Sequence, residues 1–158
     1  MDRIEKKALL RAPLARVWQA VSDAAQFGSW FGARFSGPFA AGTRLSASIS
    51  PTTVDPEVAK LQKPHEGMAF DFWVECVEPM RYISFRWHPY AIEPGVDYSD
   101  EPTTLIEFTL EPSDGGTLLT IVESGFENIP LARRAAAFRA NEGGWAHQMR
   151  MVEGYLTR

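Results

Sequence analysis

Apolar and polar residues alternate over residues 4–10, which is the pattern of a β-strand with one buried face. The same alternation returns along the chain, and a turn sequence, "PSDGG" (112–116), separates the last two alternating segments. Further strands are therefore predicted at 45–50, 68–76, 81–88, 103–110 and 117–126. Successive strands with short turns between them indicate an antiparallel meander.

Two short helices are expected directly after the first strand. Apolar residues recur at helical spacing over 14–21, and Pro13 suits a first helical turn because its missing N–H is not needed there. Ser22 or Asp23 can cap a second helix, which we predict over 24–31.

Three aromatic residues, Phe27, Trp30 and Phe31, are concentrated in the second of these helices. They either complete a core or line an interior that must sometimes open. Composition favours a wide interior, because aromatic residues make up 12% of the 158 residues, with five Trp and ten Phe. A chain of this length can bury a sizeable core, and we expect a single domain over 1–158.

A long helix is predicted at the end of the chain, where residues recur at the spacing of one helix face. The face consists of Leu131, Ala135, Phe138, Glu142, Trp145, Met149, Val152 and Leu156. A carboxylate in an apolar stripe is costly to bury, so Glu142 is either a polar anchor for a ligand, an acid/base group, or turned to solvent. Gly143 and Gly144 favour the last interpretation, because they permit a bend or a break of the helix.

Charge and composition exclude several kinds of partner. The net charge of −4 gives no basic footprint for nucleic acid or for an anionic membrane. No segment approaches the ~18 apolar residues of a membrane span, and the first residues lack the features of a signal peptide. The single cysteine, Cys76, excludes an internal disulfide and favours a reducing compartment. We therefore expect a cytoplasmic protein that binds neither nucleic acid nor membrane.

The sequence contains none of the standard catalytic or nucleotide-binding motifs. It has no G-x-S-x-G elbow, no G-x-G-x-x-G loop, no P-loop and no H-E-x-x-H pair. The three histidines, His65, His88 and His147, are widely separated, so the ligand spacing of a zinc site is missing. Cys76 lies on the apolar face of the strand over 68–76, which indicates a buried, inert thiol. We expect no metal and no cofactor.

Two proline-rich, charged regions, 50–67 and 88–102, fit neither a helix nor a strand pattern. Irregular segments of this length in a compact domain are usually functional or mobile. We interpret both as loops that control access to the interior.

Several motifs occur together over nearly the whole chain. In "APLARVWQAVSDAAQFGSWF" (12–31) they are Pro13, Val17, Trp18, Ser22, Asp23, Trp30 and Phe31. Further along they are Gly67, Pro79, "FRW" (85–87), "GGTLLTIVESGF" (115–126) and Gly144–Trp145. With these residues the chain resembles the START-like (SRPBCC) superfamily, in the branch named after the activator of heat-shock-protein-90 ATPase. The two long loops depart from the pattern of that family.

The resemblance implies an α+β helix-grip fold, in which a curved antiparallel β-sheet wraps around a long C-terminal helix and two short helices follow the first strand. It also implies an internal cavity between the sheet and that helix. The sequence leaves open which strand faces line the cavity, and aromatic faces are favoured because ligand pockets are mostly apolar. The candidate ligand-binding residues are Trp30, Phe31, Phe70, Phe72, Phe85, Trp87, Phe108, Glu142, Trp145 and Met149.

Three functions fit these observations, and binding of a small hydrophobic or aromatic ligand is favoured because no catalytic constellation is present. The first alternative is an enzyme similar to the polyketide cyclases or dehydratases, with Glu142, His88, Tyr82 and Arg86 as candidate acid/base groups. The second is a stress module associated with a chaperone ATPase. A chaperone partner is not favoured, because the first strand starts within a few residues of Met1, where the family's co-chaperones have an additional N-terminal domain. A homodimer is compatible with all three.

Overall fold

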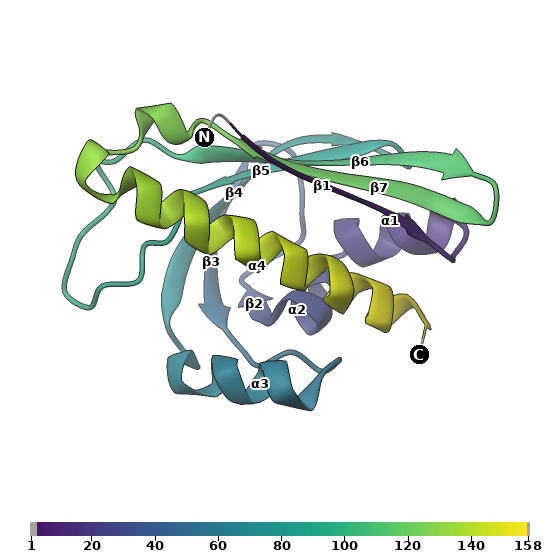
Figure 1. Ribbon diagram of the computed structural model, residues 1–158, viewed down its shortest axis with the longest axis horizontal. Helices are drawn as coiled ribbons and strands as arrows, with labels where there is room; N and C mark the ends of the chain where they lie inside the picture. Colours follow the sequence, from purple (N-terminus) through teal and green to yellow (C-terminus); the bar gives the residue numbers. More distant parts are fainter. Residues whose placement is uncertain (1–2, 158) are drawn as a thin grey trace.

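The computed structural model describes residues 3–157, which form one antiparallel sheet, one long helix and several short helices (Figure 1). The strands are β1 (Arg3–Leu10), β2 (Ala33–Phe35), β3 (Thr43–Ile49), β4 (Ala69–Glu78), β5 (Tyr82–Trp87), β6 (Thr104–Ser113) and β7 (Gly116–Ser124). The helices are α1 (Leu14–Ser22), α2 (Ala24–Phe31), α3 (Pro56–Gln62) and α4 (Leu131–Thr157), with the 3-10 turns η1 (Lys63–His65) and η2 (Phe126–Asn128).

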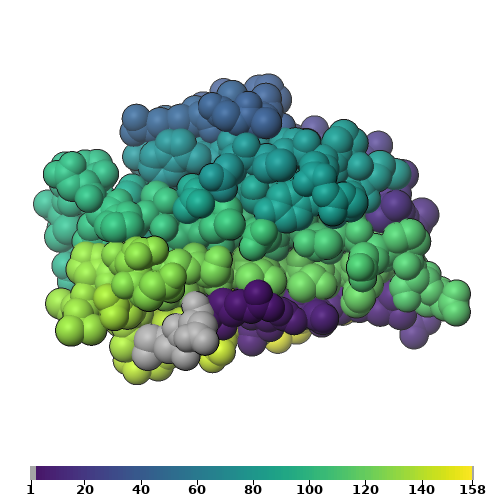
Figure 2. All heavy atoms as spheres, turned by 90° about the horizontal axis from the view of Figure 1, so that it is seen from above, coloured from purple at the N-terminus to yellow at the C-terminus, as the bar shows by residue number. Residues whose placement is uncertain are grey.

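The sheet has the strand order β1-β7-β6-β5-β4-β3-β2, and every neighbouring pair is antiparallel. Helix α4 crosses one face of this sheet, and α1 and α2 lie on the same side (Figure 1). Figure 2 shows the opposite face, where the residues of β4 to β7 appear in teal to green. A long helix held across a curved antiparallel sheet is the predicted α+β helix-grip fold, which is thereby confirmed.

One residue, Asp23, ends α1 and begins α2. Its backbone N–H donates to the carbonyl of Gln19, and its side chain accepts from the backbone N–H of Gln26 at 2.9 Å. Gly32 then closes α2 with φ 95°, a left-handed conformation that glycine adopts without strain. The predicted second helix over 24–31 is confirmed, with the same bounds.

The interior between α2 and the sheet is filled by aromatic rings around Phe27. The Phe27 ring centroid lies between 4.6 and 6.3 Å from those of Trp30, Phe31, Phe35, Phe39, Phe72, Phe85 and Phe108. Trp30 Nε1 donates to the Ala20 carbonyl at 2.8 Å, which satisfies the only polar atom of this side chain inside the core. The protein therefore packs this end of the fold with its own side chains.

The region 50–67, predicted as irregular, contains α3 and η1. Asp55 caps α3 by accepting from the backbone N–H groups of Glu57 and Val58, and Pro56 occupies the first turn. Because α3 has no buried residue, it shows no apolar periodicity in the sequence. Residues 88–102 form turns without a helix or strand, as predicted.

Two other predictions about local structure need correction. Helix α4 is continuous from Leu131 to Thr157, so Gly143 and Gly144 do not break it. In β4, a bulge between Val74 and Cys76 shifts the register, and Val77 packs against the core beyond it. The prediction that Cys76 lies on the apolar face is therefore wrong, and the thiol is free and half-buried.

Candidate ligand-binding site

A pocket of about 240 Å³, here called the central pocket, opens beside the middle of α4. Its walls come from the end of α2, from α3, from β3 to β5, from the start of the 88–102 loop and from α4. It is lined by Phe31, Ile49, Gln62, Met68, Phe70, Trp87, His88, Tyr90, Ala91, Ile92, Asn141 and Gln148. None of these lining residues is Asp, Glu, Lys or Arg, so the wall is largely apolar and offers a ligand no formal counter-charge.

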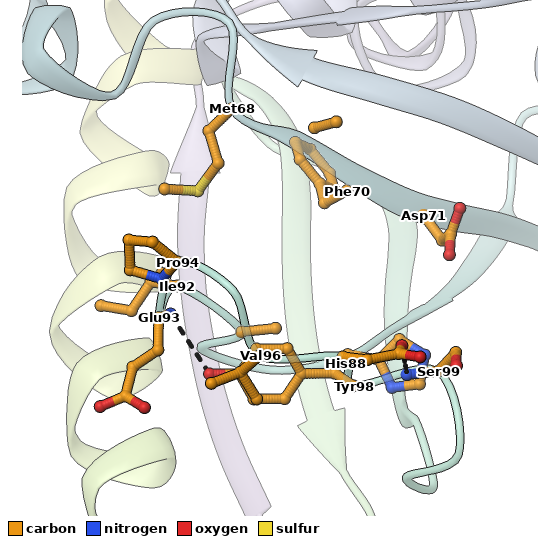
Figure 3. Close-up of a pocket in the computed structure, with 13 residues that line it drawn as sticks. Met68, Phe70, Asp71, His88, Ile92, Glu93, Pro94, Val96, Tyr98 and Ser99 are labelled. Carbon is orange, nitrogen blue, oxygen red and sulfur yellow. Dashed lines mark hydrogen bonds between the residues drawn. The ribbon is translucent and has the colours of Figure 1, made fainter.

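A wider opening of about 370 Å³, the rim pocket, adjoins the central pocket along the 88–102 loop. Figure 3 shows it between Met68 and Phe70 on one side and the loop residues Ile92 and Val96 on the other. The carboxylates at this rim are Asp71, Glu93 and Asp97. A hydrogen bond from the Ser99 N–H lowers the pKa of Asp97, which keeps that side chain charged. Asp71 forms an ion pair with Arg44 at 3.0 Å, so the negative charge at the approach to the central pocket comes from Glu93 and Asp97.

A smaller hollow of about 80 Å³, the deep pocket, extends the central pocket between β5 and α4. The residues that line both pockets are Phe31, Trp87, Asn141 and Gln148. The deep pocket also reaches Gly144 and Trp145 of α4. A ligand in the central pocket can thus extend toward the helix backbone.

Glu123 of β7 lies behind the deep pocket, with 0% of its surface exposed. Trp145 Nε1 donates to its Oε1 at 2.8 Å, and Trp87 Nε1 donates to its Oε2 at 2.8 Å. Thr104 Oγ1 donates to Oε2 at 2.5 Å, and the Asn141 amide donates to both oxygens at 2.9 and 3.2 Å. All of these donors are neutral groups, and no ion pair within residues 3–157 includes Glu123.

These hydrogen bonds fix the wall of the pocket. An indole N–H can only donate, so Trp87 and Trp145 both need the acceptor that Glu123 provides. Their rings are held with centroids 5.8 Å apart and planes inclined by 31°. A buried carboxylate is costly unless its lone pairs are satisfied, and the charge-assisted bonds at Glu123 meet that condition. Glu123 therefore acts as a positioning residue that orients the pocket wall from behind.

Two side chains that line the central pocket each have one buried polar atom with no hydrogen-bond partner among the described residues. These atoms are the Oε1 atom of Gln148 and the Nδ1 atom of His88. Burial lowers the pKa of His88, so the ring is neutral at neutral pH. Unpaired buried polar atoms are rare in native proteins, so these two are unusual features of the side chains around the pocket.

Arg133 of α4 fastens the 88–102 loop to the helix. Its Nε and Nη2 donate to Glu101 Oε1 at 2.8 and 2.6 Å, and its Nη1 donates to the Pro89 carbonyl at 2.8 Å. Its guanidinium also lies 4.8 Å from the ring centroid of Tyr98. The side chains of this ion pair are only 19% and 22% exposed, so solvent screens it less than a surface pair. The contacts hold the loop wall of the central and rim pockets against α4.

The ten candidate residues from the sequence fall into three groups. Those on the pocket walls are Phe31, Phe70, Trp87 and Trp145. Those in the packed core, each at most 1% exposed, are Trp30, Phe72, Phe85 and Phe108. The remaining two are Met149 and Glu142, which line none of the three pockets and lie outside this packed group. Met149 is buried and Glu142 is exposed.

Glu142 is exposed because the first part of the predicted stripe does not face the core, whereas Trp145, Met149 and Val152 further along it are buried as predicted. Leu131, the first residue of that stripe, is 79% exposed. Asn141 and Gln148, two polar residues seven positions apart on one helix face, reach the pockets instead. The polar group at the pocket is thus an amide rather than the carboxylate of Glu142.

The acid/base candidates are also separated by the fold. Tyr82 and Arg86 project from the outer face of the sheet, where Tyr82 donates to Glu107 at 2.6 Å and Arg86 pairs with Glu75 at 3.0 Å. Burial and the bond to Glu107 raise the pKa of Tyr82 to about 12. Of the four candidates, His88 is the one that the structure places at the pockets.

Sequence patterns did not single out Glu123, Asn141 or Gln148. Within residues 3–157, no cluster of three or more His, Cys, Asp or Glu has the arrangement of a metal site. In the same part of the chain, no helix has both the length and the apolar character needed to cross a membrane.

A curved antiparallel sheet, a long C-terminal helix across it and a pocket between them define a protein of the START-like (SRPBCC) class. Within that class, the chain belongs to the family of activator of Hsp90 ATPase homolog 1-like proteins, whose sequence model matches residues 11–157. The resemblance noted from the sequence is confirmed.

Solved structures agree with this assignment of the fold. Protein MLL2253 from Mesorhizobium loti has a TM-score of 0.71 at 22% identity, covering 99% of this chain and 97% of that one. A protein from Arthrobacter aurescens has a TM-score of 0.73 at 19% identity, covering 98% and 86%. DynU16, a protein in the dynemicin biosynthetic locus, has a TM-score of 0.69 at 24% identity; the match covers 99% of this chain and 48% of DynU16. A search of curated proteins found no match.

Proposed function

We propose that this protein binds a small hydrophobic or aromatic molecule in the central pocket. The observation that carries the proposal is a largely apolar pocket of about 240 Å³ whose lining contains no Asp, Glu, Lys or Arg side chain. Ligand pockets are typically apolar with a few polar groups that fix orientation, and this pocket has that composition. An apolar cavity of about 150 Å³ is enough for benzene, so this one has room for a bicyclic ring.

The expected affinity follows from the buried area. A bicyclic ring of the size of a Trp side chain buries up to about 250 Å², which at about 25 cal/mol per Å² corresponds to about 6 kcal/mol. That free energy corresponds to a dissociation constant of tens of micromolar, before hydrogen bonds are added. Binding in this range is measurable by calorimetry and by fluorescence of the wall residues Trp87 and Trp145.

Two adjacent glycines of α4 provide a matched test. A Cβ atom added at Gly143 or Gly144 would meet nothing within 4 Å, so both positions accept a side chain. Only Gly144 lines the deep pocket; Gly143 is exposed. The variants Gly144→Leu and Gly143→Leu should both fold, and each should gain helix stability because glycine is replaced. Gly144→Leu fills the deep pocket and is expected to weaken binding of a bicyclic aromatic probe at least about tenfold.

The comparison separates occupancy of the pocket from general effects on the helix. Equal affinity of both variants and the unchanged protein for naphthalene-type probes would contradict binding at this site. Native mass spectrometry of the protein purified from its own host gives an independent result, because a retained small molecule identifies the ligand directly.

An enzyme of the polyketide cyclase or dehydratase kind is the second candidate, and His88 is the observation in its favour. A neutral imidazole at the edge of an apolar pocket can act as a general base. Incubating the protein with a bound aromatic polyketide and following its mass and absorbance separates the two functions. Release of the ligand unchanged supports binding alone, whereas a product that disappears in His88→Phe supports catalysis.

A further inference from the structure

The buried carboxylate of Glu123 has complete hydrogen bonds but no counter-charge. Glu123 has 0% of its surface exposed, and both of its oxygens accept from neutral N–H and O–H groups. Within residues 3–157, no cationic side chain forms an ion pair with it. Hydrogen bonds satisfy the lone pairs, but the charge still attracts a cation strongly, because the effective dielectric constant of a protein interior is low.

The deep pocket is separated from this carboxylate by one layer of side chains. Trp87, Asn141 and Trp145 all line the deep pocket. Each of them also donates directly to Glu123, at distances from 2.8 to 3.2 Å. These three side chains are neutral, so they do not cancel the charge behind them. A ligand group in the deep pocket therefore lies in the field of a buried negative charge.

Aromatic rings make up most of the wall of the deep pocket. The ring centroids of Phe31, Trp87 and Trp145 lie 5.8–6.1 Å from one another. A cation within about 6 Å of a ring centroid is attracted by the negative potential of the ring face, and this attraction is strongest for tryptophan. The rings and the carboxylate behind them thus favour the same sign of charge.

The charges along the approach have the same sign. Among the described residues, no Lys or Arg lines the rim, central or deep pocket. Asp71 at the rim is paired with Arg44, whereas Glu93 and Asp97 form no ion pair within the part of the chain that the structure describes. An anionic ligand would therefore pass two carboxylates and find no counter-charge, whereas a cation is attracted at both ends of the path.

We infer that the ligand of the central pocket is an aromatic compound with a quaternary nitrogen, whose positive charge lies in the deep pocket against Trp87 and Trp145, with Glu123 as its buried counter-charge. This inference rests on the proposed function and specifies its ligand. A quaternary nitrogen has no N–H group, so it can be buried among aromatic rings without leaving a donor unsatisfied. The aromatic body of the ligand occupies the central pocket, and the deep pocket of about 80 Å³ takes the charged end.

Three probes of the same fused-ring size separate charge from hydrophobicity. They are the permanent cation N-methylquinolinium, its neutral isostere 1-methylnaphthalene and the anion 1-naphthoate. Calorimetry measures their dissociation constants, and the unchanged protein should bind N-methylquinolinium most tightly. The ratio of the dissociation constants of the two methylated probes is then compared between protein variants. The hydration of each probe cancels in this comparison, so the coupling that remains reports the charge.

Glu123→Gln removes the buried charge and keeps the shape of the side chain. This variant is expected to weaken binding of N-methylquinolinium at least about tenfold more than binding of 1-methylnaphthalene. Glu142→Gln makes the same chemical change on the exposed face of α4 and should leave the ratio unchanged. Salt screens exposed charges but has little effect on buried ones, so the preference for the cation should persist when the ionic strength is raised from about 0.05 to about 0.5 M.

The two adjacent glycines of α4 test where the charge lies, in variants that keep Glu123. Gly144→Leu fills the deep pocket and should weaken N-methylquinolinium more than 1-methylnaphthalene, which can remain in the central pocket. Gly143→Leu is the matched control, because a side chain there is exposed and meets nothing within 4 Å of its Cβ atom. It should leave the ratio of the two dissociation constants unchanged.

The outcomes distinguish the inference from the function on which it rests. If neither methylated probe binds at the highest soluble concentration, the proposed function fails and the inference fails with it. If 1-methylnaphthalene binds but Glu123→Gln, or Gly144→Leu where the first variant does not fold, leaves the ratio unchanged, the function stands and the inference is overturned.

Two further results would also overturn the inference. One is tighter binding of 1-naphthoate than of N-methylquinolinium. The other is loss of the preference for the cation at high salt, which would assign the attraction to the exposed carboxylates of Glu93 and Asp97. A changed ratio in Glu123→Gln and Gly144→Leu, with an unchanged ratio in the two control variants, supports it.

Discussion

Replacing Glu123 by glutamine tests whether a buried carboxylate organises the pocket wall. Glutamine has nearly the same shape, but one of its two terminal groups is a donor. Oε1 accepts from Trp145 and Asn141, and Oε2 accepts from Trp87, Thr104 and Asn141. Glu123→Gln therefore places an N–H₂ group against at least one indole N–H.

The magnitude follows from the best arrangement available to the glutamine. Its nitrogen replaces Oε2, because the Thr104 hydroxyl can turn and accept from it. The Trp87 N–H then loses its acceptor, which costs about 1–3 kcal/mol for a buried donor. The hydrogen bonds that remain on Oε1 are weaker because the acceptor is no longer charged, which costs about 1 kcal/mol in all. A neutral amide is less costly to bury than a carboxylate, and this difference offsets part of the two losses. We expect a net loss of about 2 kcal/mol in the free energy of unfolding.

Urea denaturation followed by circular dichroism measures this loss, and thermal unfolding should show a decrease of about 4–8 °C for a domain of this size. Glu142→Gln makes the same chemical change on the exposed face of α4 and should alter stability by less than about 0.5 kcal/mol. A Glu123→Gln protein as stable as the original, or more stable, would refute the reasoning. It would mean that the desolvation of the carboxylate outweighs all its hydrogen bonds.

Three further changes have defined outcomes. Asp23→Ala removes the side-chain cap of α2 and is expected to lower the free energy of unfolding by about 1 kcal/mol in urea titrations. Arg133→Leu releases the 88–102 loop, so amide hydrogen exchange should accelerate in the loop and the free energy of unfolding should fall by about 1–3 kcal/mol. The control Arg139→Leu, on the exposed face of α4, should change neither quantity. Because burial lowers the pKa of His88 below its ordinary 6.5, the unfolded chain binds more protons than the folded one as pH falls through that value. The melting temperature should therefore decrease below about pH 6.5, and this contribution should be absent from His88→Phe.

Local signals in the sequence were sufficient for most of the fold. The cap at Asp23 and the apolar spacing around it define α2, because the same residues that signal a helix terminus also form it. Alternation along β7 also contains the information that was overlooked at Glu123. Leu119, Ile121 and Glu123 occupy alternate positions, so a carboxylate on that strand had to face the interior. The alternation implies an inward Glu123, but it could not show four donors converging on its carboxylate.

The pocket face of α4 could not be read from hydrophobicity. Asn141 and Gln148 lie on this face but are polar, so a search for apolar residues rotates the stripe toward Glu142. The bulge at Val74–Cys76 is a similar case, because one extra residue inverts the alternation without a Gly or Pro to signal it. Both errors occur where side chains from distant segments determine which residue faces inward.

The buried polar side chains around this pocket differ in whether their hydrogen bonds are complete, and this difference does not follow their burial. Glu123 is the most deeply buried of them, yet each of its oxygens has donors within the chain, so nothing is left for a ligand to complete. Gln148 and His88 are less buried as residues, but each keeps one buried polar atom without a partner among the described residues. An unpaired buried acceptor costs about 1–3 kcal/mol, which a folded protein tolerates more readily where a partner arrives from outside. The same rule therefore assigns Glu123 to the architecture of the wall and sets it apart from Gln148 and His88, whose hydrogen bonding the chain leaves incomplete.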